Sequence, residues 1–272
     1  MSPYDLTTLP ALKSWLGLPS AAGPSDATLA ATITAASRSI YAHLGRPALT
    51  PQTYMETIDL ETQRVFLRQW PVLSVNWVTW RGVSVPACQN TDLDATNGYA
   101  LQLGDAAPPG RPQALDLFGG YYRPGRQSLA VSYSAGYAVQ SEVQTVPASP
   151  YELTAAAPFG PWSSDLGVTY AASGAALTKV AAAPTAGQYT VSGGVYAFAA
   201  ADASQGVALS YGYVPQDITQ ATLELAAARF RAADHIGLNS KSIGGQETIA
   251  FDASAIPAPV AAMLQPYVRV AV

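Results

Sequence analysis

Residues 207–218 read VALSYGYVPQDI, and the pattern of the sequence changes within this stretch. From Val207 to Tyr213, large apolar residues alternate with small or polar ones, which predicts a strand with one buried face. After Pro215, apolar residues recur at three- and four-residue steps beginning at Ile218, as in an amphipathic helix. The chain therefore passes here from a β-rich region into a helical one.

An earlier strand, LAVSYSAGY at residues 129–137, ends another β-rich region. Between the two, residues 138–213 hold several short alternating runs, with a hairpin signal at Gly193-Gly194. Short strands at regular spacing are typical of a small β-sandwich. We therefore predict an inserted β-module at 138–213 within a frame formed by residues 1–137 and 214–272.

Helical patterns lie toward the two ends of the chain. Residues 26–44 carry an apolar stripe that includes Leu29, Ile33 and Ile40. Gly45 and Pro47 follow directly, and this pair ends helices because Gly accepts the left-handed conformation and Pro cannot continue the helix. The same reasoning predicts four helices in all, at 7–16, 26–44, 217–236 and 259–267.

Residues 53–137 show a period of two with loops rich in Gly and Pro, which predicts an antiparallel β subdomain. In the run LSVNWVTW, residues 73–80, simple alternation places Leu73, Val75 and Trp77 on one face. The other face then holds Asn76, Val78 and Trp80. The fold class expected is α+β, a helical core with an antiparallel subdomain and an inserted small β-sandwich-like domain.

Charged residues make up 12% of the chain and hydrophobic residues 49%. Two interpretations stay open: a genome rich in Ala, Gly and Ser, or a subunit whose neighbours cover much of its surface, since interface cores are poor in charge. The formal net charge is −4. That value argues against broad electrostatic wrapping of nucleic acid, which requires clustered Lys and Arg.

The sequence shows no catalytic constellation, and we predict no catalytic residues, no metal site, no cofactor and no enzymatic activity. Cys88 is the only cysteine, so an intramolecular disulfide and a multi-cysteine metal site are excluded. His43 and His235 lie near predicted helix ends, where a dipole role is the simpler interpretation. Residues 90–94, NTDLD, resemble a calcium loop only briefly, because Ala95 stands where the turn glycine belongs.

Neither a signal peptide nor a membrane span is expected from the sequence. Residues 1–5 lack a basic region followed by an apolar one, and no apolar run has the length of a bilayer. We expect no membrane partner and a protein made in the host cytoplasm.

Eight segments of the chain form a recognisable combination: LPALKSWLGL (9–18), SDATLAATITAASRSIYAHLGRP (25–47), LRQWPVLSVNWVTWRG (67–82), LAVSYSAGY (129–137), VPQDI (214–218), ATLELAAARFRA (221–232), IGGQETIAF (243–251) and LQPYVRV (264–270). Through these segments, the two ends of the chain together resemble the head–tail adaptor (connector) proteins of tailed bacteriophages and gene-transfer agents. Through residues 165–203, the insert resembles a small β-domain found in phage virion proteins.

This resemblance implies a structural virion protein that forms a ring, expected to hold 12 copies, at the head–tail junction. Such a ring joins the portal protein to a stopper or tail-completion protein. It extends the channel through which double-stranded DNA passes without sequence recognition during packaging and ejection.

The resemblance also directs attention to two groups of residues. The C-terminal segment of such adaptors reaches toward the portal, and a deletion of residues 263–272 is expected to abolish docking while leaving the fold intact. The helix at 217–236 carries a face of small and apolar residues suited to close helix packing between subunits. The portal-docking residues expected are Met263, Leu264, Tyr267, Val268, Arg269, Val270 and Val272, and the inter-subunit residues expected are Ile218, Ala221, Leu225, Ala228 and Ala232.

Two other classes remain open at this point. One is a tail-completion or decoration virion protein whose β-module binds a glycan or a partner. The other is an enzyme, which the lack of an acid–base or nucleophile pair disfavours.

Overall fold

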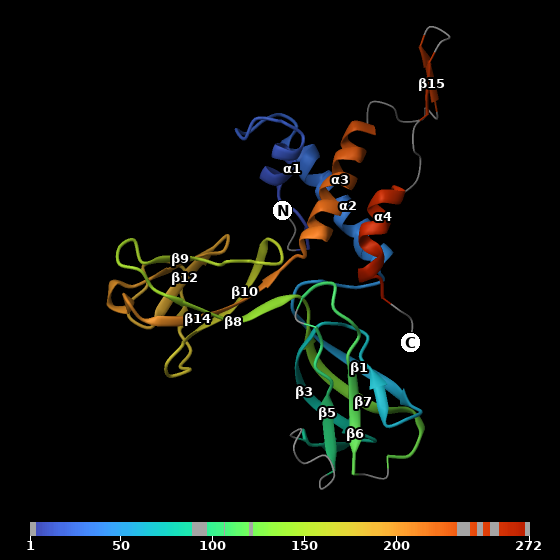
Figure 1. Cartoon of the computed structure of the whole chain (residues 1–272), viewed down its shortest axis with the longest axis vertical. Helices are drawn as coiled ribbons and strands as arrows, with labels where there is room; N and C mark the ends of the chain where they lie inside the picture. Colours follow the sequence, from blue (N-terminus) through green and yellow to red (C-terminus); the bar gives the residue numbers. More distant parts are fainter. Residues whose placement is uncertain are drawn as a thin grey trace. The chain divides into compact units, whose positions relative to one another are not determined.

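Figure 1 shows the computed structural model, which describes residues 4–88, 97–105, 107–119, 122–232, 240–243, 247–250 and 256–269. The chain divides into two compact units. The two ends, residues 1–47 and 216–270, form a helical unit, and residues 48–215 form a β unit. The protein thus combines helices with several sheets, in which every pair of named strands except β11–β12 is antiparallel.

In the helical unit, α3 contacts α1, α2 and α4. The buried side chains of α2 and α3 meet along these contacts, so segments from opposite ends of the sequence share one apolar interior. The elements of this unit are α1 (Leu9–Trp15), α2 (Asp26–Leu44), α3 (Gln216–Ala232), β15 (Ser240–Ile243), β16 (Glu247–Ala250), α4 (Ala258–Leu264) and the 3₁₀ turn η3 (Gln265–Tyr267).

The helix ends follow local chemistry. α1 begins after Thr8, whose hydroxyl accepts a hydrogen bond from the Ala11 N–H at 3.3 Å, so the helix is shorter than the predicted 7–16. α2 spans the predicted residues and ends at Gly45 with φ of 63°. α4 gives way to a 3₁₀ turn because Pro266 has no N–H to donate. The predicted helix 217–236 is described as far as Ala232, and the rest lies outside the described residues.

Lys13 fixes the linker between α1 and α2. Its side chain is buried, and its ammonium group donates to the Ala21 carbonyl at 2.5 Å and to Asp26 Oδ1 at 2.9 Å. The hydrogen bond from Lys13 is the main reason that the pKa of Asp26 lies below its usual value. A buried lysine is tolerated here because a carbonyl and a carboxylate both meet its charge.

The β unit contains two hydrophobic clusters, which define a first lobe (residues 48–137) and a second lobe (residues 138–215). In the first lobe, a four-stranded sheet of order β1-β7-β3-β4 and a three-stranded sheet of order β2-β6-β5 share one core. Its strands are β1 (Gln52–Leu60), β2 (Arg64–Phe66), β3 (Val72–Trp80), β4 (Val83–Val85), β5 (Gly98–Leu101), β6 (Ala114–Phe118) and β7 (Gly125–Ala135).

The alternation predicted for residues 73–80 is correct in placing Val78 and Trp80 on one face and wrong in grouping Val75 with Trp77, because β3 carries two bulges against β7. The register shifts between Val72 and Ser74 and again between Val75 and Trp77. Each bulge inserts an extra residue and moves the following side chains to the other face. As a result the core-facing positions are Val72, Val75, Val78 and Trp80, opposite Ala135, Tyr133, Val131 and Leu129 of β7.

The second lobe also has two sheets over a shared core, of order β10-β14-β8 and β11-β12-β13-β9. Residues Gly193 and Gly194 both have positive φ in the tight turn between β12 and β13, as the Gly-Gly signal predicts. The elements are β8 (Ala138–Thr145), β9 (Glu152–Thr154), β10 (Trp162–Tyr170), β11 (Thr178–Lys179), β12 (Gln188–Ser192), β13 (Val195–Phe198), the 3₁₀ turn η1 (Ala200–Asp202) and β14 (Gly206–Tyr213).

The passage from one lobe to the other is short. Gly136 lies between β7 and β8 with φ of 144°, and a Cβ there would come within 2.5 Å of the backbone at Thr50 and Pro51. Only glycine fits such a close approach. The two lobes together form one compact unit, which separates residues 48–137 from the helices. The predicted grouping of residues 48–137 with the helices in a single domain stays a prediction.

Candidate interaction surfaces

The C-terminal segment expected to dock on a portal is partly built into the helical unit. Leu264 and Tyr267 are 0% and 1% exposed, the Tyr267 hydroxyl donates to Asp217 Oδ2 at 3.1 Å, and the Arg269 N–H donates to the Leu44 carbonyl at 2.8 Å. Met263 and Val268 are half-buried and Arg269 is exposed, whereas Val270 and Val272 lie outside the described residues.

This burial corrects the expectation that residues 263–272 are dispensable for the fold. A deletion from Met263 onward would remove two core side chains together with the bonds that hold the segment. Burial of this leucine and this tyrosine stabilises the fold of the single chain, without any partner. Portal docking through Met263, Val268, Arg269, Val270 and Val272 stays a prediction.

The predicted inter-subunit face of α3 is divided between interior and surface. Ile218, Ala221 and Leu225 are buried in the helical unit, where α3 packs on the chain's own helices. Helix packing within one chain therefore accounts for these three side chains, and they leave no surface for a second copy. Ala228 and Ala232 are exposed.

The outer face of the four-stranded sheet in the first lobe is formed mainly by uncharged residues of three strands, with the exposed Asp59 toward the end of β1. Register places Met55 and Trp77 on either side of Ser132, with Ser132 almost fully covered. Met55 is 74% exposed and Trp77 39%. We call this surface the Met55 face; its nine residues are Thr53, Met55, Thr57, Ser74, Trp77, Thr79, Ala130, Ser132 and Ser134.

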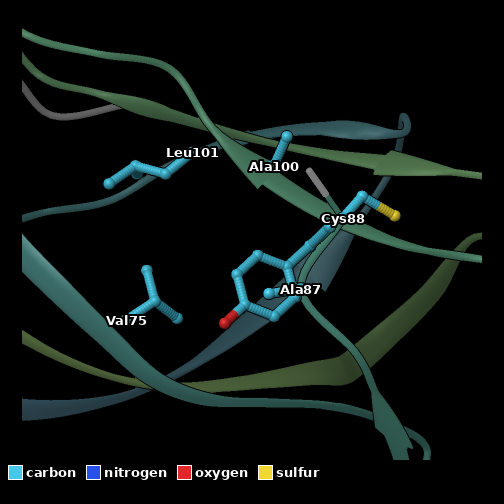
Figure 2. Close-up of a pocket in the computed structure, with 6 residues that line it drawn as sticks. Val75, Ala87, Cys88, Ala100 and Leu101 are labelled. Atoms are coloured by element: carbon cyan, nitrogen blue, oxygen red, sulfur yellow. The ribbon is translucent and has the colours of Figure 1, made fainter. Parts of the chain in front are cut away.

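A pocket of about 310 Å³ with a mixed polar and apolar lining opens between β3 and β5 of the same lobe. Figure 2 shows Val75, Cys88 and Leu101 around it. We call it the Cys88 pocket; its lining residues are Val75, Ala87, Cys88, Tyr99, Ala100 and Leu101, none of which carries a formal charge at neutral pH.

One wall of the Cys88 pocket depends on Gly98. A Cβ at this position would lie 2.1 Å from Cys88 Sγ and 2.7 Å from the Pro86 carbonyl oxygen. Two backbone hydrogen bonds join residues 86–88 to Tyr99. The Cys88 N–H donates to the Tyr99 carbonyl at 2.8 Å, and the Tyr99 N–H donates to the Pro86 carbonyl at 2.9 Å. The segment that carries Cys88 is therefore held against β5. Burial raises the pKa of Tyr99.

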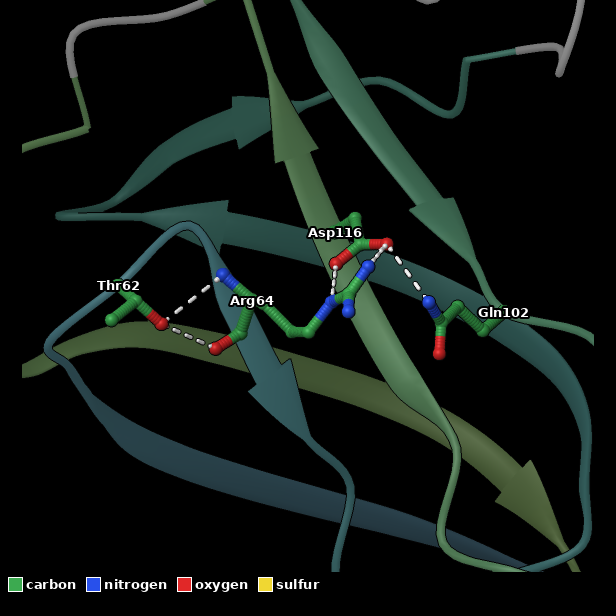
Figure 3. A network of polar contacts seen from close by, with 4 residues as sticks. All are labelled: Thr62, Arg64, Gln102 and Asp116. Atoms are coloured by element: carbon green, nitrogen blue, oxygen red, sulfur yellow. Dashed lines mark hydrogen bonds and ion pairs between the residues drawn. The ribbon is translucent and has the colours of Figure 1, made fainter.

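A polar cluster on the outer side of the three-stranded sheet links β2 to β6 and has a structural role (Figure 3). Arg64 binds Asp116 in a two-point contact, Nε to Oδ1 at 2.6 Å and Nη2 to Oδ2 at 3.0 Å, and Gln102 donates to the same carboxylate. The Asp116 hydrogen bond raises the pKa of Arg64, which stays charged. Because Arg64 is half exposed, such a pair contributes little to stability.

In the second lobe, three acidic side chains are each bound by tyrosine hydroxyls. Tyr189 donates to Asp165 at 2.9 Å, Tyr170 donates to Asp202 at 2.6 Å, and Tyr211 donates to Glu142. Lys179 also pairs with Asp165 at 3.2 Å. These bonds satisfy carboxylates in or beside the core, so each has a structural role.

The tyrosine partners of these carboxylates resist ionisation. Burial first, and then the hydrogen bond to Glu142, raise the pKa of Tyr211 to about 12. Burial likewise raises the pKa of Tyr189, next to Asp165. Repulsion between a phenolate and the neighbouring carboxylate acts in the same direction as burial and adds to both pKa shifts.

Residues with metal or catalytic potential do not gather. Within the described ranges, no three His, Cys, Asp or Glu side chains come together to hold a metal ion. His43 lies in the last turn of α2. His235 and the loop at 90–94 lie outside the described residues. Among the helices that the structure describes, none combines the length and the apolarity needed to cross a bilayer.

Neither the Met55 face nor the Cys88 pocket was predicted from the sequence. The sequence carries little signal for either one. A single exposed Met in an alternating strand does not distinguish one sheet face from another, and which residues of β3 join this face depends on the two bulges. The pocket requires Cys88 and Leu101 to meet across a loop. Only the three-dimensional pairing of β3 with β7 and of β5 with β6 brings these residues into place.

Comparisons with known proteins give little. No protein-family model matches the sequence, and no curated protein matches it. One solved structure that is similar in part is described as the neck of an empty GTA particle computed with C6 symmetry. It shares 14% sequence identity, covers 100% of this chain and 94% of its own, and has a TM-score of 0.42. A likeness at this level carries no argument about function.

Proposed function

We propose that this chain is a structural virion protein that forms an adaptor ring between the portal and the tail. The proposal rests on the sequence resemblance at the two ends of the chain. The observation that carries it is the helical unit itself, in which residues 1–47 and 216–270 pack together although the whole β unit intervenes. A resemblance divided between two distant segments requires such a meeting.

The surface chemistry supports a structural role. A chain with 12% charged residues and a net charge of −4 offers few cations to phosphates, which suits a channel wall past which DNA slides. Rings arise when one surface of a subunit binds a different surface of the next and the rotation closes. The expected partners are further copies of this chain, the portal protein and a stopper or tail-completion protein.

Electron microscopy of the protein mixed with its portal tests this function. Twelve copies of the 28.3 kDa chain would form a closed ring of about 340 kDa on the portal. Portal particles without an added ring would contradict the proposal.

Docking by the C-terminal segment needs a gentler change than a deletion from Met263. We expect the double substitution Val268→Asp and Arg269→Glu to abolish portal binding, because it reverses an exposed charge and adds another beside it. Circular dichroism should remain that of the wild type, since neither side chain is in the core. Gln216→Glu, at the exposed start of α3, is the matched control. Unchanged portal binding by the double variant would place the docking surface elsewhere.

A second candidate is a tail-completion or decoration protein whose second lobe binds a glycan or a partner. The observation that favours it is the separate hydrophobic cluster of the second lobe, which includes Leu153, Tyr196 and Leu209. A glycan-binding screen of the full chain distinguishes the two candidates, because the adaptor function predicts no glycan ligand.

A further inference from the structure

We propose that two copies of this chain pair through β1, whose open edge joins the same edge of the second copy in one continuous antiparallel sheet. The contact lies within the first lobe, so only the geometry of residues 48–137 enters. It goes beyond the proposed ring and does not depend on it. A two-fold contact joins copies in pairs, whereas a ring requires different surfaces to meet head to tail.

β1 is a long and regular edge strand. It spans Gln52–Leu60, stands at one end of the sheet order β1-β7-β3-β4, and pairs with β7 alone among the described strands. Its register on β7 runs without a shift from Gln52 to Ile58. An unpaired edge of this kind is a template for the addition of a further strand.

The other edge strands of the β unit are short or irregular. β2, β4, β5, β9 and β11 have at most four residues each. The register of β10 on β14 shifts at two places, and that of β8 on β14 shifts at one. Short and bulged edges resist pairing with another chain. Among the described edges of the β unit, the edge of β1 is therefore the one suited to receive a strand.

Hydrogen bonds at the two ends of β7 show which of its residues point toward β3. The Arg81 N–H donates to the Ser128 carbonyl at 2.7 Å, and the Gly136 N–H donates to the Pro71 carbonyl at 2.9 Å. Arg81 follows β3 and Pro71 precedes it. Because the backbone groups of successive strand residues alternate in direction, the even-numbered residues of β7 bond to β3 and the odd-numbered ones to β1.

The register on β7 then identifies the backbone groups at the free edge of β1. Glu56 lies opposite Val131, an odd-numbered residue, so Glu56 bonds to β7. Thr53, Met55 and Thr57 alternate with it, so their N–H and C=O groups point outward, where no backbone partner meets them in the described part of the chain. All three side chains are exposed, and Met55 is 74% exposed, so a further strand has access.

One register makes this edge complementary to itself. With Met55 opposite Met55 of the second copy, Thr53 lies opposite Thr57 and Thr57 opposite Thr53. Each such pair exchanges two backbone hydrogen bonds, so the outward groups of all three residues are satisfied in both copies. Thr–Thr pairs on neighbouring strands are favourable, and the two exposed methionines become neighbours at the two-fold axis.

The adjacent registers are less favourable. A shift toward the end of β1 places Glu56 directly opposite Glu56 of the second copy, and like charges in that position destabilise a sheet. A shift toward its start places Thr57 opposite Pro51, which has no N–H to donate. In the centred register Glu56 lies opposite Tyr54, and its carboxylate already accepts from the Tyr133 hydroxyl at 2.6 Å. A second copy of β1 is therefore the strand that fits this edge.

Register-specific disulfide trapping tests the contact. Cys88→Ser removes the only cysteine of the chain, and Thr53→Cys or Thr57→Cys is then added singly in that background. After equal mixing and mild oxidation, we expect a 53–57 disulfide between copies, because opposite residues have Cα atoms about 5.5 Å apart. Each variant alone should give little dimer, since identical positions lie roughly 13 Å apart along the strands. Mass spectrometry of the digested dimer identifies each link.

Val83→Cys in the same background is the matched control, since Val83 is 65% exposed on β4, at the opposite edge of the same sheet. A 53–57 link that exceeds the 53–53, the 57–57 and all Val83→Cys links supports the pairing. Equal amounts of all links, a dominant link between identical positions, or no link overturns it.

Sedimentation equilibrium supplies a measurement without thiol chemistry. Met55→Lys brings two ammonium groups together at the two-fold axis, so we expect the dissociation constant of the dimer to rise at least tenfold. Val83→Lys adds the same charge at the opposite edge of the sheet and should leave the constant unchanged. Equal constants for the two variants, or a wild type that is monomeric at about 100 μM, overturn the inference.

Neither measurement involves the portal. Loss of this dimer therefore leaves the proposed ring standing, and the absence of a ring on the portal leaves the dimer standing.

Discussion

At the scale of single residues, the first lobe shows how one missing side chain shapes a site. Gly98 allows the segment of Cys88 to lie directly on β5, where there is no room for a methyl group. The pocket wall therefore depends on the absence of a Cβ. No other residue type satisfies the same contact.

We expect Gly98→Ala to lower the free energy of unfolding by about 1–3 kcal/mol, because overpacking forces Cys88 and the Pro86 carbonyl apart. Urea unfolding followed by tryptophan fluorescence measures the loss. Gly206→Ala is the control, since its new methyl group would meet Ala171 at an ordinary 3.4 Å. Equal stability of the two variants would show that the close approach is not rigid.

At the scale of elements, Lys13 joins α1 to the linker and to the first turn of α2. A buried ammonium group with a carbonyl and a carboxylate partner fixes three segments at one point. The exposed pair of Arg111 and Asp105, 3.9 Å apart, has no such effect.

We expect Lys13→Met to destabilise the protein more than Arg111→Ala, a change in the β unit, does at pH 7. Asp26 has a folded-state pKa below its unfolded value, so its contribution is present above about pH 4 and is lost as the pH falls through the folded pKa. The difference between wild type and Lys13→Met should therefore shrink in acid. Denaturant midpoints at pH 7 and pH 3 measure it, and a constant difference would contradict the assignment to Asp26.

At the scale of the whole molecule, the β unit has two hydrophobic clusters of its own, whereas the helical unit is assembled from both ends of the chain. The apolar stripe of α2 is buried where α2 contacts α3. Each end of the sequence therefore depends on the other for its interior.

We expect residues 48–215 to fold when expressed alone and residues 1–47 to remain unfolded alone. Most helical stability comes from the packing of an amphipathic face, which residues 1–47 cannot complete without α3. Circular dichroism and thermal unfolding of the two fragments measure this. A helical, cooperatively melting 1–47 fragment would show that the N-terminal helices need no C-terminal partner.

Much of the secondary structure could be predicted from local pattern. The bounds of α2, the Gly45 cap and the Gly193-Gly194 hairpin all depend on residues within a few positions of one another. The strands β8 and β9 were not predicted, because β8 is polar and largely exposed and β9 has three residues. Edge strands carry little periodic signal, so their sheet neighbours determine them.

By itself, the sequence determined the bounds of α2, the turn between β12 and β13, and the lack of a recognisable catalytic motif, since each depends on short-range chemistry. Only the tertiary structure decided the faces of β3, the burial of Leu264 and Tyr267, and the separation of Met55 from the Cys88 pocket. Bulges and close contacts arise between strands distant in sequence. A bulge is defined by the pairing of two strands, since two residues of one strand lie opposite one residue of its partner. The alternation along a single strand therefore cannot reveal it.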